Sequence, residues 1–286
     1  MTEPVVVGVD GTGRSLRALL WAARDAAMRG APLRVIHTLP RWDGDIPAFP
    51  PGRFEEAEFR GRGIIKEAVA AVGEAQPGLE VSTDQPMSTP AKALLAEAAD
   101  AQAVVLGAKG EDVGNLLLGS TVLQVVGHAA CPVVVVGHLA TGHGRISVGT
   151  DGSPDSTAAL AYAFDEARLR GDRVRVVNAL GLPQGWPRHL LQPLPEEDQE
   201  VAARRAQVEE QVAGLCEEYP DVKVELDVHR YNPVETLVGD SHRSDLLVLG
   251  SRGRGGFHGL AVGSVTHAMT HLSGCPVAVV RAPRPE

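Results

Sequence analysis

The chain has 286 residues, of which 44% are apolar and 22% are charged, a composition that is typical of soluble globular proteins and excludes collagen-like, disordered and disulfide-scaffold chains. At roughly 100–200 residues per domain, this length predicts one large domain or two of ordinary size, and it favours two. The 27 Lys and Arg residues against 36 Asp and Glu residues give a formal charge of −9, which argues against nucleic acid or an anionic membrane as a partner, so any phosphate site must be local.

The sequence repeats itself. The segment VVVGVDGTGRSLRALLWA returns as ISVGTDGSPDSTAALAYA, which aligns Asp10 with Asp151. Further along, LLLGSTVLQVVGHAACPVVVV returns as LAVGSVTHAMTHLSGCPVAVV. A tandem duplication of this kind predicts two domains, residues 1–138 and 144–286, with the boundary in the glycine-rich GHLATGHGR segment.

Short β-branched runs alternate with longer segments of helical period in each copy. In the first copy we expect strands at Val5–Val9, Leu33–Thr38, Leu79–Thr83, Ala103–Gly107 and Val133–Val136. We expect helices at Ser15–Arg29, Glu55–Gly73, Pro90–Ala99 and Ser120–His128. This alternation is typical of a parallel sheet covered on both faces, and right-handed crossovers then make each copy a doubly wound, five-stranded α/β domain.

A glycine-rich segment, Gly250 to Ser264, follows the fourth expected strand of the second copy. In open parallel sheets, ligands bind beyond the carboxyl ends of the strands where the strand order reverses. Glycines let backbone N–H groups approach a polyphosphate, and a helix that begins near Gly263 offers free N–H groups and its positive dipole end. Arg252 and Arg254 would neutralise phosphate charge, and the Ser264 hydroxyl would donate to a phosphate oxygen or cap its own helix. A solvated glycine-rich turn is the alternative interpretation.

The spacing in this segment resembles the universal stress proteins, whose ATP-binding members carry G-x2-G-x9-G-[ST] between the fourth strand and the next helix. The second copy matches this pattern at Gly250, Gly253, Gly263 and Ser264. The likeness extends to the first strand end and to a closing C-P-V-x-V-V strand, and it covers nearly the whole chain twice. It implies a tandem protein with the adenine nucleotide alpha hydrolase-like fold that binds ATP, with or without Mg²⁺.

The same resemblance implies roles for individual residues. An Asp at the first strand end contacts the ribose in the family, which transfers to Asp10 and Asp151, and a carboxylate suits two adjacent hydroxyls. An Asp that caps the first helix or holds a turn is the alternative. The backbone at Thr38 and Ala179 would meet the adenine edge. The other nucleotide-binding residues expected are Gly8, Gly11, Thr12 and Thr121 in the first copy and Gly149, Gly152, Ser153, Arg252, Arg254 and Val265 in the second.

The first copy departs from the family pattern in its loop. It keeps three glycines and the hydroxyl, at Gly107, Gly110, Gly119 and Ser120. The spacer 111–118, however, holds eight residues rather than nine. Glu111 and Asp112 bring carboxylates near any bound phosphate, with Lys109 as the opposing cation, so Coulomb repulsion predicts a weaker site in this copy.

Two further motifs are decoys. The stretch Gly8–Ser15 nearly spells a phosphate-binding P-loop, but Arg14 replaces the required Lys, and the second copy has Pro154 in place of the second glycine. His267 and His271 stand four apart on an expected helix, yet no third ligand is evident, and a helix face is the better interpretation. We therefore expect no metal site and no catalytic residues.

Three classes of function remain open. The first is a cytoplasmic ATP-binding regulator of stress response or growth arrest, in which ATP orders loops by tying the glycine-rich loop to the first-strand Asp. The second is a slow ATPase or adenylate-transferring enzyme, for which Arg252 and Arg254 supply charge but no base is evident. The third is a dimerisation scaffold with relic loops. The complete motif of the second copy favours the first class, a binding module, with weak ATP hydrolysis left open.

Location and assembly follow from simpler patterns. There is no apolar run of about 18 residues and no signal-like start, so we expect no membrane span and a cytoplasmic location. The three Cys residues are far apart and lack a C-x-x-C pair, which favours reduced core thiols. The apolar last strands, Cys131–Val136 and Cys275–Val280, invite pairing at sheet edges. In the resembled family these edges pair, which implies an internal pseudo-dimer and allows a further homodimer.

Overall fold

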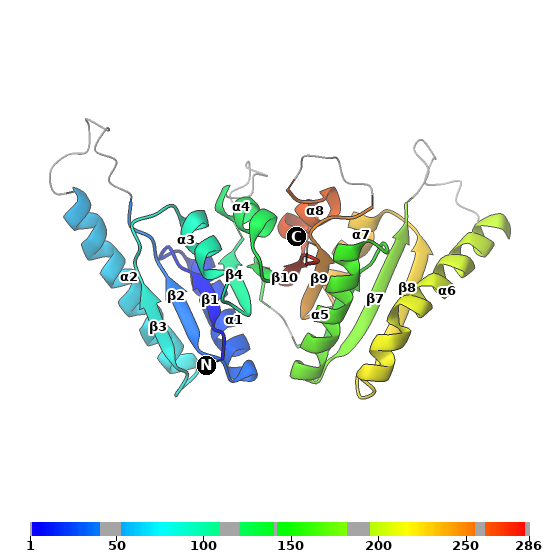
Figure 1. Ribbon diagram of the computed structural model, residues 1–286, viewed down its shortest axis with the longest axis horizontal. Coiled ribbons are helices and arrows are strands. Elements are labelled where there is room, and N and C mark those ends of the chain that lie inside the picture. The colour runs from blue at the N-terminus through cyan, green and yellow to red at the C-terminus, as the bar shows by residue number, and fades with distance from the viewer. Residues whose placement is uncertain are drawn as a thin grey trace. The chain divides into compact units, whose positions relative to one another are not determined.

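The computed structural model forms two compact units, residues 1–139 and 140–286, drawn in Figure 1. It describes residues 2–40, 53–108, 120–139, 142–181, 195–254 and 261–283. Strands and helices alternate in the same order in both units. The duplication read from the sequence is therefore also a duplication of structure.

The first unit is a parallel α/β domain. Its elements are β1 (Val5–Gly8), α1 (Gly13–Arg29), β2 (Leu33–Ile36), α2 (Arg53–Ala75), β3 (Val81–Asp84), α3 (Pro90–Glu97), β4 (Ala103–Gly107), α4 (Ser120–His128) and β5 (Val133–Val136). The strands lie in the order β3-β2-β1-β4-β5, and every pair is parallel. The chain first moves outward from β1 to β3 and then returns to the other side of β1, so the strand order reverses between β1 and β4.

The second unit repeats this plan. Its elements are β6 (Arg145–Gly149), α5 (Pro154–Arg170), β7 (Arg173–Leu180), α6 (Pro195–Glu218), β8 (Val224–Arg230), α7 (Pro233–Ser241), β9 (Leu246–Gly250), α8 (Ser264–Leu272) and β10 (Val277–Val280). The strand order β8-β7-β6-β9-β10 is again parallel throughout, with its reversal between β6 and β9. The predicted doubly wound fold of each half is confirmed.

The helices cover both faces of each sheet. In the first unit α1 packs on α2 and α3 packs on α4, and in the second α5 packs on α6 and α7 on α8. Because right-handed crossovers place a helix on one face when the chain moves one way and on the other when it returns, each pair occupies its own face. The central strands are accordingly apolar on both sides, as the fully buried run Val5–Val7 illustrates.

Some predicted boundaries shift for local reasons. Helix α1 begins at Gly13 instead of Ser15, because the Thr12 side chain caps it by accepting a hydrogen bond from the Ser15 amide at 3.3 Å. Strand β2 ends at Ile36 instead of Thr38, although a separate bridge joins Leu39 to Met87 further on. The ladder is interrupted there, at the position where a pocket opens.

The prediction of three core thiols is wrong for Cys216. Cys275 is buried, and burial raises its pKa to about 12. Cys131 is half-buried, and burial raises its pKa to about 11. Cys216 is exposed on α6, where Val208 and Val212 are the buried apolar residues, and the next buried side chain is Tyr219, just beyond the end of the helix. All three are free thiols.

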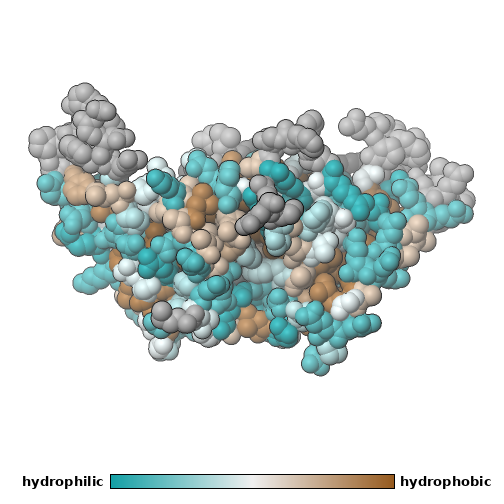
Figure 2. Space-filling view, viewed as in Figure 1, coloured by the Kyte–Doolittle hydropathy of each residue, from teal (hydrophilic) through white to brown (hydrophobic). Residues whose placement is uncertain are grey.

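The exterior carries hydrophilic side chains with scattered apolar ones between them, as the face in Figure 2 shows. The exposed large apolar side chains include Phe59, which is 72% exposed. Within the described ranges, each helix is too short or too polar to cross a bilayer.

A pair of phenylalanines tests the core of the second unit. Phe164 is fully buried on α5, where its ring meets Tyr219 edge-on with centroids 5.7 Å apart. We expect Phe164→Ala to lower the free energy of unfolding by about 3–5 kcal/mol, because it leaves a cavity. In urea titrations, Phe59→Ala is the control and should change this energy by less than about 0.5 kcal/mol. Equal losses for the two variants would contradict this packing.

Candidate functional site

Each unit has a pocket beyond the carboxyl ends of its strands, where the strand order reverses. The pocket of the second unit is a cavity of about 260 Å³. Its lining residues are Gly149, Thr150, Asp151, Ser156, Val177, Ala179, Pro233, Leu237, Leu249, Gly250, Arg252, Gly253, Gly263, Ser264, Val265 and Thr266. They come from the ends of three strands and the starts of three helices, the arrangement that parallel sheets use for ligands.

The first unit has an equivalent pocket of about 460 Å³. Its lining residues are Gly8, Val9, Asp10, Thr12, Arg14, Ser15, Ile36, His37, Thr38, Pro90, Leu94, Leu106, Gly107, Ala108, Thr121 and Val122. Most members of the two linings align with one another around the pair Asp10 and Asp151, but Arg14 lines the first pocket while its counterpart Asp155 does not line the second.

A close backbone approach forms the wall of each pocket. A Cβ atom on Gly250 would lie 2.7 Å from the carbonyl carbon of Asp155, and one on Gly107 would lie 3.0 Å from that of Arg14. The end of the fourth strand of each unit therefore touches the start of the first helix. Only glycine permits this contact without a backbone shift.

Asp151 lies at the centre of the second pocket. Its Oδ1 accepts a hydrogen bond from the Ser153 amide at 2.9 Å, and its Oδ2 accepts one from the Arg254 amide at 2.7 Å. Burial alone would raise the pKa of Asp151, but hydrogen bonds from Ser153 and the Arg254 amide outweigh it and hold the pKa below its ordinary value. The carboxylate is thus ionised at neutral pH and ready to accept further hydrogen bonds.

The glycine-rich loop folds back over the turn that follows β6. A Cβ atom on Gly253 would lie only 2.4 Å from Asp151 Oδ2, so the loop passes directly against the carboxylate. The Arg254 guanidinium donates to the carbonyl of Gly152 at 3.2 Å. Gly152 has a φ of +76°, and a side chain there would collide with this guanidinium. The loop and the turn therefore hold each other.

Helix α8 begins at the pocket without a side-chain cap. Its N-cap residue is Gly263, and no side chain accepts from its first turn. The Gly263 amide donates to Ser251 O at 2.8 Å, and Thr266 Oγ1 donates to Gly250 O at 2.7 Å, so the helix start is tied to the end of β9. The first-turn amides of α8 and the positive end of its dipole are available to an anion.

The structure excludes two capping roles raised by the sequence, and it bears out the turn-holding role of the two Asp residues. Ser264 does not cap its helix, because it is the first helical residue and the cap position belongs to Gly263. Asp10 and Asp151 do not cap their helices either, because Thr12 and Ser153 do so. Each Asp instead accepts a hydrogen bond from the amide two residues on, which holds the turn.

The first unit repeats the turn with different detail. Asp10 Oδ1 accepts from both the amide and the hydroxyl of Thr12, at 3.0 and 2.6 Å. Burial would raise the pKa of Asp10, but these hydrogen bonds lower it overall. Of the loop residues predicted for this half, Lys109, Gly110 and Gly119 lie outside the described residues, as do Glu111 and Asp112.

The predicted site residues that the structure describes fall into three groups. Those that line a pocket are Gly8, Asp10, Thr12, Thr38, Gly107, Thr121, Gly149, Asp151, Ala179, Gly250, Arg252, Gly253, Gly263, Ser264 and Val265. Those that support the turn or the loop behind the second lining are Gly152, Ser153 and Arg254. Gly11 and Ser120 are described but do not belong to the lining of the first pocket.

A pair of residues at the end of the second strand escaped the sequence analysis. The Nδ1–H of His37 donates to Val9 O at 2.8 Å, and the Nδ2 amide of Asn178 donates to Thr150 O at 2.7 Å. Both side chains fix the backbone just before or at the pocket Asp. His37 and Asn178 are 141 positions apart, the same offset that separates Asp10 from Asp151, and this match was the signal that could have revealed them.

The walls formed by α3 and α7 were also missed. Pro90 and Leu94 line the first pocket, and Pro233 and Leu237 line the second. These apolar side chains close the side of each pocket beside the second strand. The sequence shows them only as the apolar face of a short helix, which does not distinguish a pocket wall from the core.

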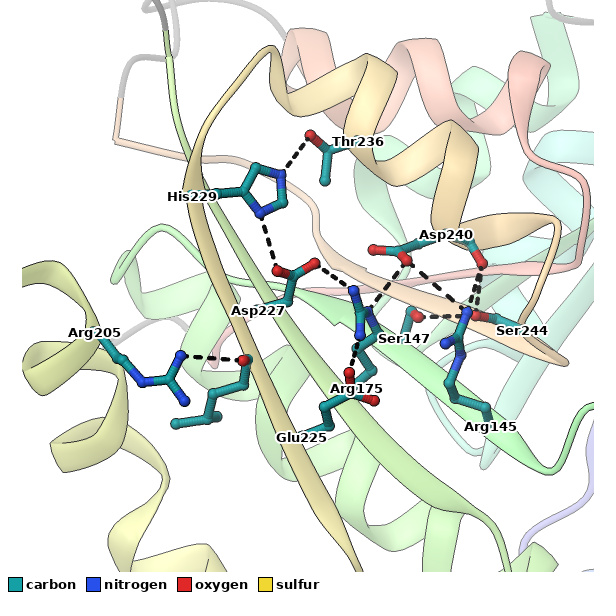
Figure 3. Close-up of polar contacts among 11 residues, drawn as sticks. Arg145, Ser147, Arg175, Arg205, Glu225, Asp227, His229, Thr236, Asp240 and Ser244 are labelled. Carbon is teal, nitrogen blue, oxygen red and sulfur yellow. Dashed lines mark hydrogen bonds and ion pairs between the residues drawn. The ribbon is translucent and has the colours of Figure 1, made fainter. Parts of the chain in front are cut away.

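A partly buried polar network holds α7 against its sheet (Figure 3). Arg175 of β7 forms ion pairs with Asp240 of α7 at 3.2 Å and with Asp227 of β8 at 2.5 Å. The Asp240 side chain is 4% exposed. Burial would lower the pKa of Arg175, but the surrounding carboxylates raise it overall. In the first unit, Arg34 occupies the equivalent place. The network fixes the helix that supplies the pocket wall.

The histidine pair on α8 forms no larger ligand cluster. The rings of His267 and His271 meet edge-on with centroids 5.1 Å apart. Burial, and then the neighbouring His267, lower the pKa of His271. Among the described residues, no group of three His, Cys, Asp or Glu side chains is placed to hold a metal ion.

Comparisons with known proteins agree on one family. The model of the universal stress protein family matches residues 1–137 and 143–281. A universal stress protein of Mycobacterium tuberculosis is 37% identical over 97% of this chain and 96% of its own, and one of Mycolicibacterium smegmatis is 36% identical over the same shares. A universal stress protein structure from Archaeoglobus fulgidus covers 99% of this chain and 98% of its own, with a TM-score of 0.74 and 16% identity, a likeness of fold.

The contact between Gly253 and Asp151 can be tested by adding one methyl group. We expect Gly253→Ala to push the loop off the carboxylate, because the methyl would lie 2.4 Å from Asp151 Oδ2. Hydrogen exchange of the Arg254 amide should then accelerate by on the order of 10-fold. Gly214→Ala is the control, since a Cβ there meets open space. An unchanged Arg254 exchange rate in Gly253→Ala would contradict the loop position.

The ionised state of Asp151 gives a pH-dependent prediction. Because the folded state lowers the pKa of Asp151, its carboxylate stabilises the fold above the ordinary value of 3.8, and this contribution is lost as the pH falls through the folded-state pKa. We expect Asp151→Asn to lower the free energy of unfolding at pH 7 by about 1 kcal/mol, discounted for partial solvent exposure. Urea titrations across acid pH should show the gap to wild type closing. A gap that widens on acidification would contradict this sign.

Proposed function

Because the chain belongs to the universal stress protein family, we propose that it is a regulatory protein of stress response or growth arrest that binds adenine nucleotide in each half. ATP is the proposed ligand, with or without Mg²⁺. The observation that supports this best is the meeting of three features in one pocket: an ionised Asp151, the glycine-rich loop, and the uncapped start of α8.

Each part of ATP has a matching surface in the second pocket. The phosphates suit the first-turn amides of α8 and the backbone at Gly253, where fixed N–H groups attract negative charge. The ribose hydroxyls suit the Asp151 carboxylate, which keeps lone pairs free beyond its two hydrogen bonds. The adenine suits the apolar side of the pocket near Ala179 and Leu237.

The second half is the tighter site in this proposal. Arg252 lines its pocket, and Arg254 is fixed at the turn beside it. The aligned loop of the first half has Glu111 and Asp112 in its sequence, with Lys109 as the opposing cation. Repulsion between carboxylates and phosphate lowers affinity there.

Binding rather than turnover is the proposed activity. Among the described residues that line the second pocket, Asp151 is the single carboxylate, and the ribose would use it. Phosphoryl transfer needs a group that orients the attacking nucleophile in addition to positive charge. Nucleotide occupancy would act by favouring one arrangement of the loops over another.

Two matched variants test this function. We expect calorimetric titration of the full chain with ATP to show two sites. Asp151→Ala should lower the ATP affinity of the tighter site, and Asp10→Ala should lower that of the other site. Each loss should be on the order of 10- to 100-fold, because each variant removes hydrogen bonds to a charged group.

Each of the other results has a distinct meaning. Binding of adenosine, which lacks phosphates, measures how much the phosphates contribute, and binding of GTP measures selectivity for the base. Chromatography of the incubated nucleotide detects any ADP formed. Steady ADP formation would establish a slow ATPase in place of a binding module. No heat of binding for wild type, together with no rise in thermal stability on adding ATP, would support the scaffold function instead.

A further inference from the structure

The two halves differ in charge at one aligned position close to their pockets. Asp155 stands in the first turn of α5, and Arg14 stands in the first turn of α1, 141 residues earlier. The backbone environment of the two is the same, because Gly250 touches Asp155 just as Gly107 touches Arg14. The side chains therefore differ in charge at a matched point beside the phosphate-binding loop.

Asp155 binds three groups from two other segments. Its Oδ2 accepts hydrogen bonds from Ser251 Oγ at 2.6 Å and from the Arg252 amide at 3.0 Å. Its Oδ1 accepts one from the Ala282 amide at 3.0 Å. We call this set, Asp155 with Ser251, Arg252 and Ala282, the Asp155 clamp. It joins the start of α5 to the beginning of the glycine-rich loop and to the segment after β10.

The Asp155 clamp holds the first residues of the glycine-rich loop, and a backbone hydrogen bond holds its last residue. Ser153 Oγ donates to Arg252 O at 3.2 Å, which adds to the hold on the first residues of the loop. The Gly263 amide, at the far end, is bound to Ser251 O. Both ends of the phosphate-binding loop are therefore anchored on Ser251 and Arg252, the residues that Asp155 holds.

The first half lacks the clamp as a set. The Arg14 side chain has no acceptor oxygen with which to bind a loop amide, and the Ala108 side chain, which aligns with that of Ser251, has no hydroxyl to donate. The main chain is otherwise alike, since the Ala108 amide donates to Val136 O as the Ser251 amide donates to Val280 O. Both members of the side-chain pair are changed together while the backbone contact is kept.

We propose that Asp155 is a positioning residue that preorganises the phosphate-binding loop of the second half, so that this half distinguishes nucleotides by their phosphates more strongly than the first half does. The inference rests on the proposed nucleotide binding. Asp155 does not touch the nucleotide in this scheme. It acts by holding Arg252 and Gly253 in place, which lowers the ordering cost when phosphate binds.

The clamp itself is tested without nucleotide. We expect Asp155→Asn and Asp155→Arg, the latter being the residue of the first half, to accelerate hydrogen exchange of the Arg252 and Ala282 amides by on the order of 10-fold. Ser251→Ala, which introduces the residue found at Ala108, should accelerate exchange of the Arg252 amide less and leave exchange of the Ala282 amide unchanged. Asp221→Asn is the control of equal charge change, on an exposed turn. Exchange rates for both amides that match wild type in Asp155→Asn would overturn the clamp.

The positioning role is tested by the phosphate dependence of binding. The full chain carries Asp10→Ala in every sample, so that the measured binding comes mainly from the second half. The probes are adenosine, AMP and ATP. We expect Asp155→Asn to lower the affinity for ATP by about 10-fold and the affinity for adenosine by less than about 2-fold. The reason is that the loop contacts only the phosphates in the proposed complex. A merely structural role would weaken all three probes equally, and that result would overturn the proposal.

The binding and exchange results together distinguish an absence of nucleotide binding from an absence of the positioning role. If the Asp10→Ala chain binds none of the three probes, nucleotide binding is wrong and so is the positioning role, while the exchange rates still decide whether the clamp exists. If that chain binds ATP and Asp155→Asn leaves the ratio of ATP to adenosine affinity unchanged, nucleotide binding stands and the positioning role is wrong.

Discussion

Both pockets depend on one steric constraint: the end of the fourth strand in each unit must touch the start of the first helix. At Gly250 and Gly107 this contact leaves no room for a Cβ atom. Because the contact brings the two segments together beside the point where the strand order reverses, it places the glycine-rich loop of the second unit against the turn that holds Asp151. A larger residue at Gly250 would push the start of the loop in the second unit away from the Asp151 carboxylate.

Around this fixed contact, polar groups decide how rigid each pocket is. Asp151 binds the loop from within the pocket, and Asp155 binds it from behind. On the opposite face of the sheet, the ion pairs of Arg175 hold α7, whose apolar side chains close the pocket wall. The pocket is thus assembled between two helices that are separately tied to the strands by polar contacts.

Duplication explains why the two halves could diverge without loss of fold. The buried strands and the glycine contacts are shared, because each sheet needs them to close its core. The side chains at positions 14 and 155 are under no such demand, since neither belongs to the buried apolar core. Arg14 and Asp155 therefore occupy matched backbone positions with opposite charge.

The sequence by itself determined the duplication, the parallel α/β fold and most of the pocket lining, because period, glycine spacing and strand ends are patterns within short stretches of chain. It did not reveal the roles of His37 and Asn178, the α3 and α7 walls, or the exposure of Cys216. The contacts of Asp155 join residues 96, 97 and 127 positions apart, and no local pattern encodes such a pairing. Only the folded chain brings these groups within hydrogen-bond distance, because the strand order places the starts of helices beside distant strand ends.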